Sequence, residues 1–327
     1  MKKTIHILLF LALGISYLAG QSRVSPFSVD STAIYQKRQH LILYGGVGIY
    51  TSLSTGLYFT WYKQYDQGPF HLFNDYGEWE NIDKLGHVYS NYLQSDFMYQ
   101  SLRWSGYSEN KSILYGALSG LAFQTTIEVM DGFSSAWGFS LSDMAANFIG
   151  VGSFALQQKH WGEQRFRFKM SSWPKSYSQE MFSSETGIFE TTLFARTQSL
   201  FGSHGLERFL KDYNAQTLWL SVNPKSFFPD SKFPSWLNIA VGYGADNMFG
   251  GFKNQWELND ENFIIDHSVY PRTRQYVLAL DYDLSKIKTK SPFWKTILGA
   301  LNAFKFPAPA IEYTSEGDFN FHLIFKN

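Results

Sequence analysis

The segment Asn81-Ile-Asp-Lys-Leu-Gly-His87 opens the part of the sequence that decides the fold. Asp83 and His87 stand four residues apart, so both side chains lie on one face if the segment is helical. Lys84 falls within the same turn. We therefore expect a helix that presents an acid, a base and an imidazole close together near its beginning.

Two later segments repeat this arrangement, each with one polar pair at helical spacing. Glu128 and Asp131 are three residues apart at the end of a long apolar run. Asp143 and Asn147 are four residues apart in the segment GFSLSDMAANFIG at 138–150. Three helices that each turn one polar pair toward a shared interior would form a buried polar centre, which also takes in Lys84.

Local structure explains some of these residues without any function. Asp143 lies three residues after Ser140, the arrangement in which a helix satisfies its own first amide groups. Asp83 stands in a first helical turn, where the helix dipole favours an acid. Glu128 and Asp131 have no such explanation, because they end a helix where the dipole disfavours anions. These two residues therefore require a partner from another part of the fold.

The sequence offers two kinds of partner for these acids: the side chains of Lys84 and His87, or a bound cation. In a catalytic hypothesis, His87 acts as an acid or base together with Asp83 and Glu128. In a metal hypothesis, a divalent ion is held by oxygen and imidazole ligands, and these are His87, Glu128 and Asp131, with Asp83 or Asp143 in addition. The plainer alternative is that His87 is buried and only hydrogen-bonded.

The three motifs, taken in order, resemble a known family. They are Asp-Lys-x-x-His at 83–87, a Glu that ends a Gly-rich apolar helix, and Gly-Phe-Ser-x-x-Asp-x-x-x-Asn-x-x-Gly at 138–150. Together they look like the YfiM-like family of exported envelope proteins of unknown function. The first and third motifs are more distantly similar to VanZ-like membrane proteins. The resemblance covers 81–158 and implies an exported envelope protein, but it supplies no catalytic residue.

The amino terminus has the pattern of a secretory signal peptide. Met1-Lys-Lys precedes an apolar run at 5–18, and Leu18-Ala-Gly20 provides a small-residue cleavage site. We expect cleavage after Gly20 and a mature protein in the periplasm or the outer membrane. Short members of the YfiM-like family look like lipoproteins. The chain has no cysteine, so we expect neither that kind of lipid anchor nor a disulfide.

The composition of the chain argues against nucleic acid as a partner and favours membrane lipid. Lys plus Arg and Asp plus Glu number 28 each, which differs from the basic footprint of proteins that bind nucleic acid. We therefore expect no nucleic-acid partner. Aromatic residues make up 18% of the chain, and Tyr and Trp favour membrane interfaces. We expect membrane lipid as a partner, with a second envelope protein as a further one.

The first half of the chain predicts a four-helix bundle. Its apolar or amphipathic runs lie at 41–62, 84–102, 112–129 and 141–157. The first run has no charged residue and is long enough to cross a bilayer, although its Tyr, Val, Thr and Gly content also suits a β-hairpin. Its Gly48, Ser52 and Gly56 form a small-residue stripe of the kind that packs helices in membranes.

The charges that flank this bundle conflict with ordinary insertion into an inner membrane. Lys37 and Arg38 precede the first helix, and Lys159 and Arg165 follow the fourth, so an up-down bundle places both flanks on one side. The positive-inside rule would make that side cytoplasmic, whereas a cleaved signal peptide places it outside. We therefore expect a bundle that is embedded in a membrane, or pressed against one, from the periplasmic side.

Beyond residue 215 the apolar period changes to two, which predicts strands. The clearest runs lie at 217–222, 236–243, 276–284 and 319–325. In the third run, alternate residues from Tyr276 onward share an apolar face, and Asp281 lies on the other. Four strands are too few for a transmembrane barrel, which needs at least about eight, so a barrel is an alternative only if the first half of the chain forms strands in place of helices. The residues after 215 also resemble a longer branch of the YfiM-like family.

The sequence as a whole predicts an α+β chain in which a membrane-associated helical bundle precedes a mainly antiparallel β region with short helices. The expected segments are a signal peptide at 1–20, a polar leader at 21–39, the bundle at 40–160, a mixed segment at 161–214 and the β region at 215–327. Short helices are expected at 206–213 and 292–304. The second of these is typical of either a core-packing or an interfacial helix.

Two functions remain open at this point. The first is non-enzymatic: the bundle docks on lipid or a partner protein, and the polar centre holds its helices in register. The second is a metal-dependent hydrolase or transferase that acts on a lipid or a lipid-linked envelope substrate. The sequence shows no phosphate loop, nucleophile elbow or His-Glu-x-x-His motif that would point to another reaction class.

Overall fold

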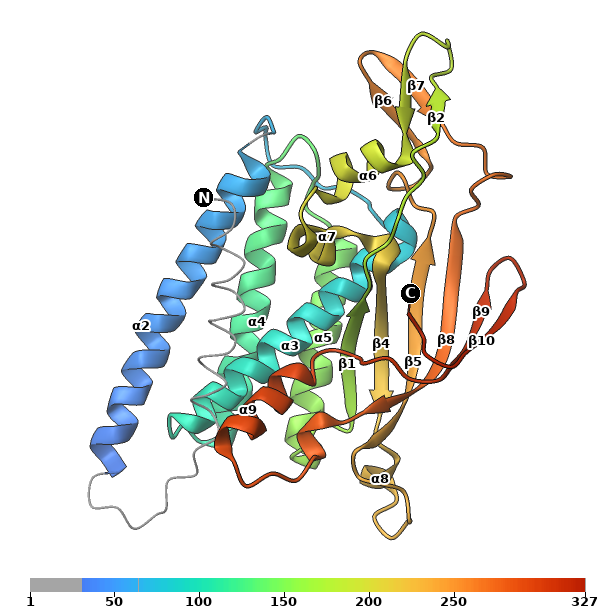
Figure 1. Ribbon diagram of the computed structural model, residues 1–327. Coiled ribbons are helices and arrows are strands. Elements are labelled where there is room, and N and C mark those ends of the chain that lie inside the picture. Colours follow the sequence, from blue (N-terminus) through green and yellow to red (C-terminus); the bar gives the residue numbers. More distant parts are fainter. Residues whose placement is uncertain (1–30, 64, 327) are drawn as a thin grey trace. The chain divides into compact units, whose positions relative to one another are not determined.

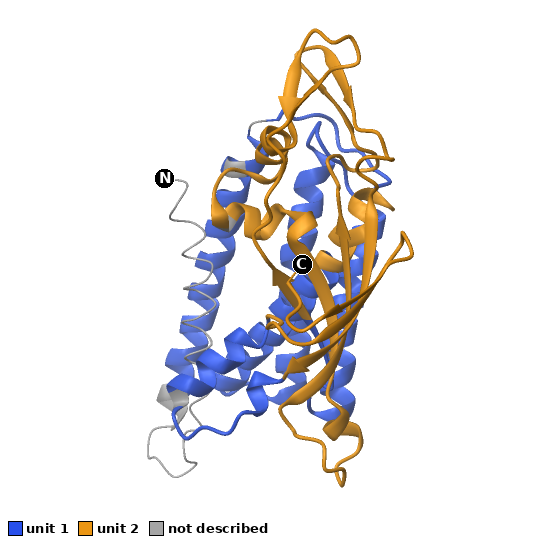
Figure 2. Cartoon of the chain, turned by 45° about the vertical axis from the view of Figure 1, so that its right-hand side comes forward, with its two compact units in different colours: residues 1–75, 87–168, 283–303 blue, residues 76–86, 169–282, 304–327 orange. Residues whose placement is uncertain are grey.

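The computed structural model describes residues 31–63 and 65–326, so the predicted signal peptide and the first part of the predicted leader lie outside it. The chain divides into two compact units (Figure 2). Unit 1 comprises residues 1–75, 87–168 and 283–303, and unit 2 comprises residues 76–86, 169–282 and 304–327. The combination of helices with a mainly antiparallel sheet confirms the α+β class.

Unit 1 is helical (Figure 1). Its helices are α2 (Ser31–Leu57), α3 (Ile82–Trp104), α4 (Glu109–Gly132), α5 (Leu141–Trp161) and α9 (Pro292–Leu301), and the first turn of α3 is counted with unit 2. A π-helical turn at Tyr58–Tyr62 continues α2. A 3-10 turn at Leu284–Lys286 precedes α9. The four helices predicted in the first half are therefore present, and the β-hairpin alternative for the first of them is wrong. Helix α2 begins within the predicted leader.

Small residues allow α4 to lie directly on α3. The buried side of α4 recurs every four residues, and it consists of Ser112, Gly116, Gly120, Gln124, Glu128 and Gly132. A Cβ atom at Gly116 would stand 2.8 Å from the backbone oxygen of Ser95 in α3, and one at Gly120 would stand 2.6 Å from the Ser95 hydroxyl. The glycines thus bring the two helix backbones close enough for polar side chains on both helices to meet.

Helix α5 approaches α3 in the same way, through Gly150. A Cβ atom at this position would collide with the backbone oxygen of Val88 in α3. Helix α5 begins after Ser140, whose hydroxyl accepts a hydrogen bond from the Asp143 N–H, and it ends at Gly162 in the left-handed conformation. The capping arrangement predicted for Asp143 is therefore confirmed.

Unit 2 is built on a six-stranded sheet with the order β1-β4-β5-β8-β9-β10 (Figure 1). The strands are β1 (Phe166–Ser172), β4 (Gln216–Val222), β5 (Leu237–Asp246), β8 (Thr273–Tyr282), β9 (Ala310–Thr314) and β10 (Phe319–His322). Neighbouring strands from β4 to β10 run antiparallel. The four predicted strands are present, whereas β1 and β9 were not predicted, because charged residues interrupt β1 and β9 has only five residues after a proline-rich segment.

Shorter elements surround this sheet. Two hairpins pair β2 (Met181–Ser183) with β3 (Glu190–Thr192), and β6 (Gln255–Leu258) with β7 (Glu261–Ile264). The short helices are α6 (Leu193–Phe201), α7 (Gly205–Lys211) and α8 (Pro224–Phe227), with 3-10 turns at Glu78–Asn81 and Tyr213–Ala215. Helix α7 corresponds to the short helix predicted at 206–213, and α9 to the one predicted at 292–304.

The two faces of the sheet have an unusual distribution of polarity. The alternation predicted for β8 is present, but the face with Asp281 is the buried one: Asp281 is 0% exposed and lies on the same face as the buried apolar residues Val277 and Ala279, whereas Leu278 is 51% exposed. Asp281 accepts a hydrogen bond from the Ser221 hydroxyl and pairs with the Lys169 ammonium at 2.8 Å. Burial lowers the pKa of Lys305, which lies in the same interior, to about 8. A half-buried strand in a water-soluble sheet has the opposite arrangement.

We expect the close approach of α5 and α3 to limit which residues can replace Gly150. Gly150→Ala should lower the free energy of unfolding by about 1–3 kcal/mol, because the added Cβ forces the helix backbones apart. Gly152→Ala is the matched control, since a Cβ there meets nothing within 4 Å and alanine raises helix stability by up to about 1 kcal/mol. Chemical denaturation followed by circular dichroism measures both changes. Equal effects of the two substitutions would contradict the packing described here.

Candidate functional site

The imidazole of His87 is the centre of the polar cluster in the helical unit. Its Nδ1 atom lies 3.1 Å from Asn147 Oδ1, and the side-chain amide of Asn91 donates a hydrogen bond to the same oxygen. Because an amide oxygen only accepts, Nδ1 carries the proton and donates. In a neutral imidazole, Nε2 then presents a lone pair to whatever lies on the other side of the ring.

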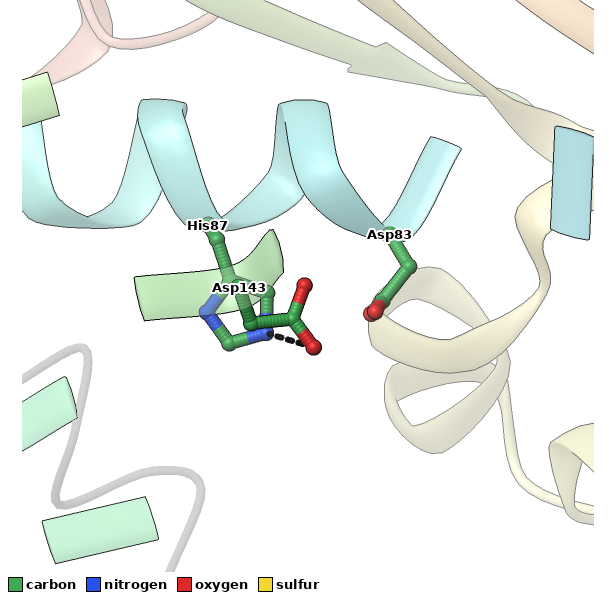
Figure 3. A group of neighbouring side chains, drawn as sticks. All are labelled: Asp83, His87 and Asp143. Atoms are coloured by element: carbon green, nitrogen blue, oxygen red, sulfur yellow. Dashed lines mark ion pairs between the residues drawn. The ribbon is translucent and has the colours of Figure 1, made fainter. Parts of the chain in front are cut away.

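That other side is occupied by carboxylates. His87 Nε2 lies 3.6 Å from Glu128 Oε1 and 3.8 Å from Asp143 Oδ2. Figure 3 shows the Asp143 carboxylate reaching toward the ring. Both distances are longer than a direct hydrogen bond, which joins atoms about 2.7–3.2 Å apart. A lone pair that faced two anionic oxygens would be unfavourable, and a second proton on the ring or a cation in this direction would remove that repulsion.

Asp83 extends the cluster along α3. It is counted with unit 2, but it stands one turn before His87 on the same continuous helix, and both side chains leave the same side of that helix (Figure 3). Asp83, His87 and Asp143 each offer one ligand atom, and these atoms lie within 4.8 Å of one another. Asp83 also accepts a hydrogen bond from the Tyr213 hydroxyl at 2.8 Å, and the Lys84 ammonium lies 3.1 Å from its other oxygen.

The start of α5 holds the Glu128 carboxylate and the backbone of Asp143. Ser140 donates its N–H to Glu128 Oε2 at 3.2 Å, and its hydroxyl accepts from the N–H of Asp143 while donating to Asp75 Oδ1 at 2.6 Å. The Ser142 hydroxyl donates to the same Asp75 oxygen. A backbone amide therefore holds the Glu128 carboxylate, and the helix cap fixes the backbone from which the Asp143 side chain extends toward His87.

The structure separates Asp131 from the rest of the predicted centre. The Asp131 carboxylate accepts a hydrogen bond from the Tyr62 hydroxyl at 2.8 Å, and Asp131 is not a member of the group formed by Asp83, His87 and Asp143. Asp131 lies about one helical turn after Glu128, where it meets Tyr62 of the π-helical turn that continues α2.

Reasoning from the sequence missed Asn91 and Tyr213, and also Asp75 and Tyr62, the partner of Asp131. Asp75 comes from the irregular segment before α3, which pairs with the loop between α4 and α5 through backbone hydrogen bonds such as those of His71 and Phe73. Tyr62 comes from the π-helical turn after α2. Neither residue has a spacing that relates it to the other motifs, so only a pattern of acids near aromatic residues in the linker could have drawn attention to them.

Burial decreases gradually across the cluster. The side chain of Glu128 is 2% exposed, that of Asp143 6%, that of His87 14% and that of Asp83 23%. Solvent or a small solute therefore reaches the cluster most readily beside Asp83. Glu128 forms its closed end.

The donor set suits a divalent cation. One imidazole nitrogen with several carboxylate oxygens is a combination that Zn²⁺, Mn²⁺ and Fe²⁺ accept. Metal bonds of about 2.0–2.2 Å place neighbouring ligand atoms about 2.9–3.6 Å apart, close to the 3.6 and 3.8 Å that separate His87 Nε2 from its two acidic neighbours. The hydrogen bond from Nδ1 to Asn147 is the kind of outer contact that orients a metal-ligating histidine.

Comparison with known proteins gives one match. Residues 71–159 match the pattern of a family described as a predicted periplasmic lipoprotein (DUF2279), a family of unknown function. The matched segment includes Asp75, Asp83, His87, Glu128, Asp143 and Asn147, but not Tyr213, which donates to Asp83. It indicates an exported, periplasmic kind of protein. Neither the curated proteins nor the solved structures contain a match to this chain.

We expect Asn147 to couple α3 and α5 energetically. Asn147→Ala should lower the free energy of unfolding by about 1–3 kcal/mol, because it leaves the donors of His87 and Asn91 without their shared acceptor. In a double-mutant cycle with Asn91→Ala, the coupling energy should be about 0.5–3 kcal/mol. Denaturation curves of the two single variants and the double variant provide the measurement. Strictly additive effects would show that the two side chains act independently.

Proposed function

We propose that this chain is an exported cell-envelope protein whose helical unit contacts the apolar part of a membrane, and whose polar centre holds the helices in register. One observation carries the proposal: beside an apolar cluster around Phe154, the interior of the helical unit holds many polar side chains, while large apolar side chains lie on its surface. Water-soluble helices turn apolar side chains inward and polar ones outward. In unit 1 the buried positions of α3, α4 and α5 include Asn91, Gln124, Glu128, Asp143, Asn147 and Gln157.

The outward positions of the same unit are apolar. Exposed large side chains include Leu43, Tyr44 and Val47 on α2, Leu114, Tyr115 and Leu118 on α4, and Phe148, Ile149 and Leu156 on α5. Water would hydrate this surface at a cost of about 25 cal/mol per Å², whereas acyl chains would not. Contiguous apolar surface of this kind marks a membrane or protein contact.

Helix α4 gives the proposal further support. Among the described residues it is the one helix that is long and apolar enough to cross a membrane by length and composition. A core helix of a soluble protein passes the same test, but such a helix would be mostly buried, whereas 28% of this apolar stretch is buried. The exposure of Leu118 and its neighbours therefore favours lipid over a water-filled surrounding.

In this proposal the polar centre has a structural or interaction role. A polar network inside an apolar environment fixes one arrangement of helices, because any slip would leave polar groups without partners. We further propose the outer membrane as the site of contact, reached from the periplasm, with lipid as the main partner. The order of motifs from Asp83 to Gly150 also supports a relationship with the YfiM-like and, more distantly, the VanZ-like proteins.

The contact with lipid is tested by placing a single cysteine on α4, since the natural chain has none. Leu118→Cys labelled with the fluorophore NBD should show blue-shifted emission in phosphatidylcholine–phosphatidylglycerol vesicles and lose intensity when the lipid carries a doxyl quencher. Lys111→Cys, in the exposed first turn of α4, is the matched control and should instead be quenched by aqueous iodide. Quenching of the Leu118→Cys label by iodide to the same extent would refute the proposal.

A second function is favoured by the environment of His87. A metal-dependent hydrolase or transferase acting on a lipid or lipid-linked substrate would use Asp83, His87 and Asp143 as ligands, with Glu128 alongside. A bound metal would activate a water molecule or polarise a phosphoryl or carbonyl oxygen. The partly exposed side at Asp83 would admit the substrate, and Glu128 would be placed to take or give a proton.

Metal analysis separates the two functions. If the second is correct, protein purified without chelator should contain about one divalent ion per chain, and His87→Ala and Asp83→Asn should lose it while staying folded. Asp131→Asn should keep the ion, because Asp131 bonds to Tyr62 instead. If the polar centre is structural only, His87→Ala should lower the yield of folded protein, and neither this variant nor the natural chain should contain stoichiometric metal.

A further inference from the structure

The sheet of unit 2 has a continuous apolar outer face. Strand register places Leu220, Val241, Leu278 and Ile311 side by side across β4, β5, β8 and β9, and Phe321 of β10 continues the row. These five side chains, all exposed, form the middle row of what we call the outer sheet face. A second aliphatic row lies next to it, where Ile239 is opposite Leu280.

Aromatic side chains border these aliphatic rows at both ends of the strands. On one side, register places Tyr243, Tyr276 and Tyr313 next to one another on β5, β8 and β9. On the other side, the rings of Trp236 and Tyr282 stack with their centroids 6.1 Å apart. The face therefore has three layers along the strand direction, which are aromatic, aliphatic and aromatic again.

Charge follows the same layering. From Tyr276 to Tyr282, the outward residues of β8 carry no charge, and the first charged outward residue is Arg274, one position beyond the tyrosine row. Its guanidinium pairs with Glu80 at 2.8 Å and is half exposed. A cation next to an aromatic row is the arrangement found where a protein surface passes from acyl chains to headgroups.

The opposite face of the sheet does not bury these apolar residues, because it has its own interior, in which polar pairs lie beside an apolar cluster that includes Trp219 and Val277. Ser221 and Asn238 are buried and joined by a hydrogen bond, and Asp281 pairs with the fully buried Lys169. The indole N–H of Trp219 donates to the Ser171 hydroxyl. A sheet that satisfies its polar groups inside and shows aliphatic groups outside resembles the walls of membrane-embedded β-structure.

We propose that the outer sheet face is a second membrane contact, in which the two aliphatic rows lie among lipid acyl chains and both aromatic rows lie at headgroup level. The distance along β8 between the two aromatic rows supports lipid as the partner of this face. Tyr282 lies six positions after Tyr276, which corresponds to about 20 Å of extended strand. That length is close to the apolar band of about 25 Å in outer-membrane β-structure, and a tilted strand would occupy less of it.

A second copy of the chain explains the face less well. Two sheets that pack face to face need complementary side chains over the whole area, with no reason for an ordered change from aromatic to aliphatic to aromatic along the strands. A bilayer imposes that order, because its interface favours Tyr and Trp and its core favours aliphatic groups. The proposal rests on unit 2 alone, so it does not depend on the contact proposed for the helical unit.

The cysteine-free chain allows a direct test with single labelled positions. Leu278→Cys and Leu280→Cys, labelled with NBD in the full chain, should show blue-shifted emission in phosphatidylcholine–phosphatidylglycerol vesicles and lose intensity with doxyl-labelled lipid. Glu257→Cys on β6 is exposed and polar, and its label should respond to iodide in water instead. Both positions on β8 are surface residues, so the substitutions leave the buried face unchanged.

Each outcome decides the question. Doxyl quenching at positions 278 and 280, without iodide quenching, supports the contact with lipid. Labels that respond to iodide as strongly as the Glu257→Cys label would overturn it. Labels protected from both quenchers would also overturn it and would indicate a protein surface, such as a second copy. Because the Leu118→Cys label on α4 reports on the helical unit separately, a failure at β8 with success at α4 refutes this inference and leaves the proposed function intact.

Discussion

Direct backbone contact between helices is the constraint on which the polar centre depends. Gly116 and Gly120 of α4 and Gly150 of α5 leave no space between these helices and α3. At that separation, short polar side chains reach one another: Asn147 meets both Asn91 and His87. Larger residues at the three glycines would move the helices apart and leave the amides and acids without partners in an apolar environment.

Both units share one unusual property, which is that polar groups are buried and large apolar groups are exposed. In the helical unit, Glu128 is 1% exposed, whereas Leu118 is 51% exposed. In the sheet unit, Asp281 is 0% exposed, whereas Val241 is 58% exposed. The hydrophobic effect of water favours the opposite distribution at these positions, although each unit also buries an apolar cluster. The membrane contacts proposed above would remove this conflict, because lipid tails are as apolar as leucine.

The acidic residues near His87 take part in helix packing and also face the imidazole with their carboxylates. Asp143 takes part in the cap of α5 through its backbone N–H, and its carboxylate faces the imidazole. Glu128 is held by the Ser140 N–H through one oxygen, and its other oxygen lies near the same ring. The first turn of α5 therefore connects α5 to α4 and also lines one side of the cluster. If a cation bound to these residues, a change in its occupancy would act on the packing of α3, α4 and α5.

The sequence by itself determined the elements and the main grouping of polar residues. Apolar periods of 3.6 and 2 located the four helices and four of the six strands of the sheet, and i, i+4 spacing identified Asp83, His87, Asp143 and Asn147. Spacing is local, so it gave no means to separate Asp131, which bonds to Tyr62, or to find Asp75. Tertiary structure alone decided which side of each element is buried. Alternation along a strand shows that two faces differ, but only the packing of neighbours shows that the face with Asp281 is the inner one.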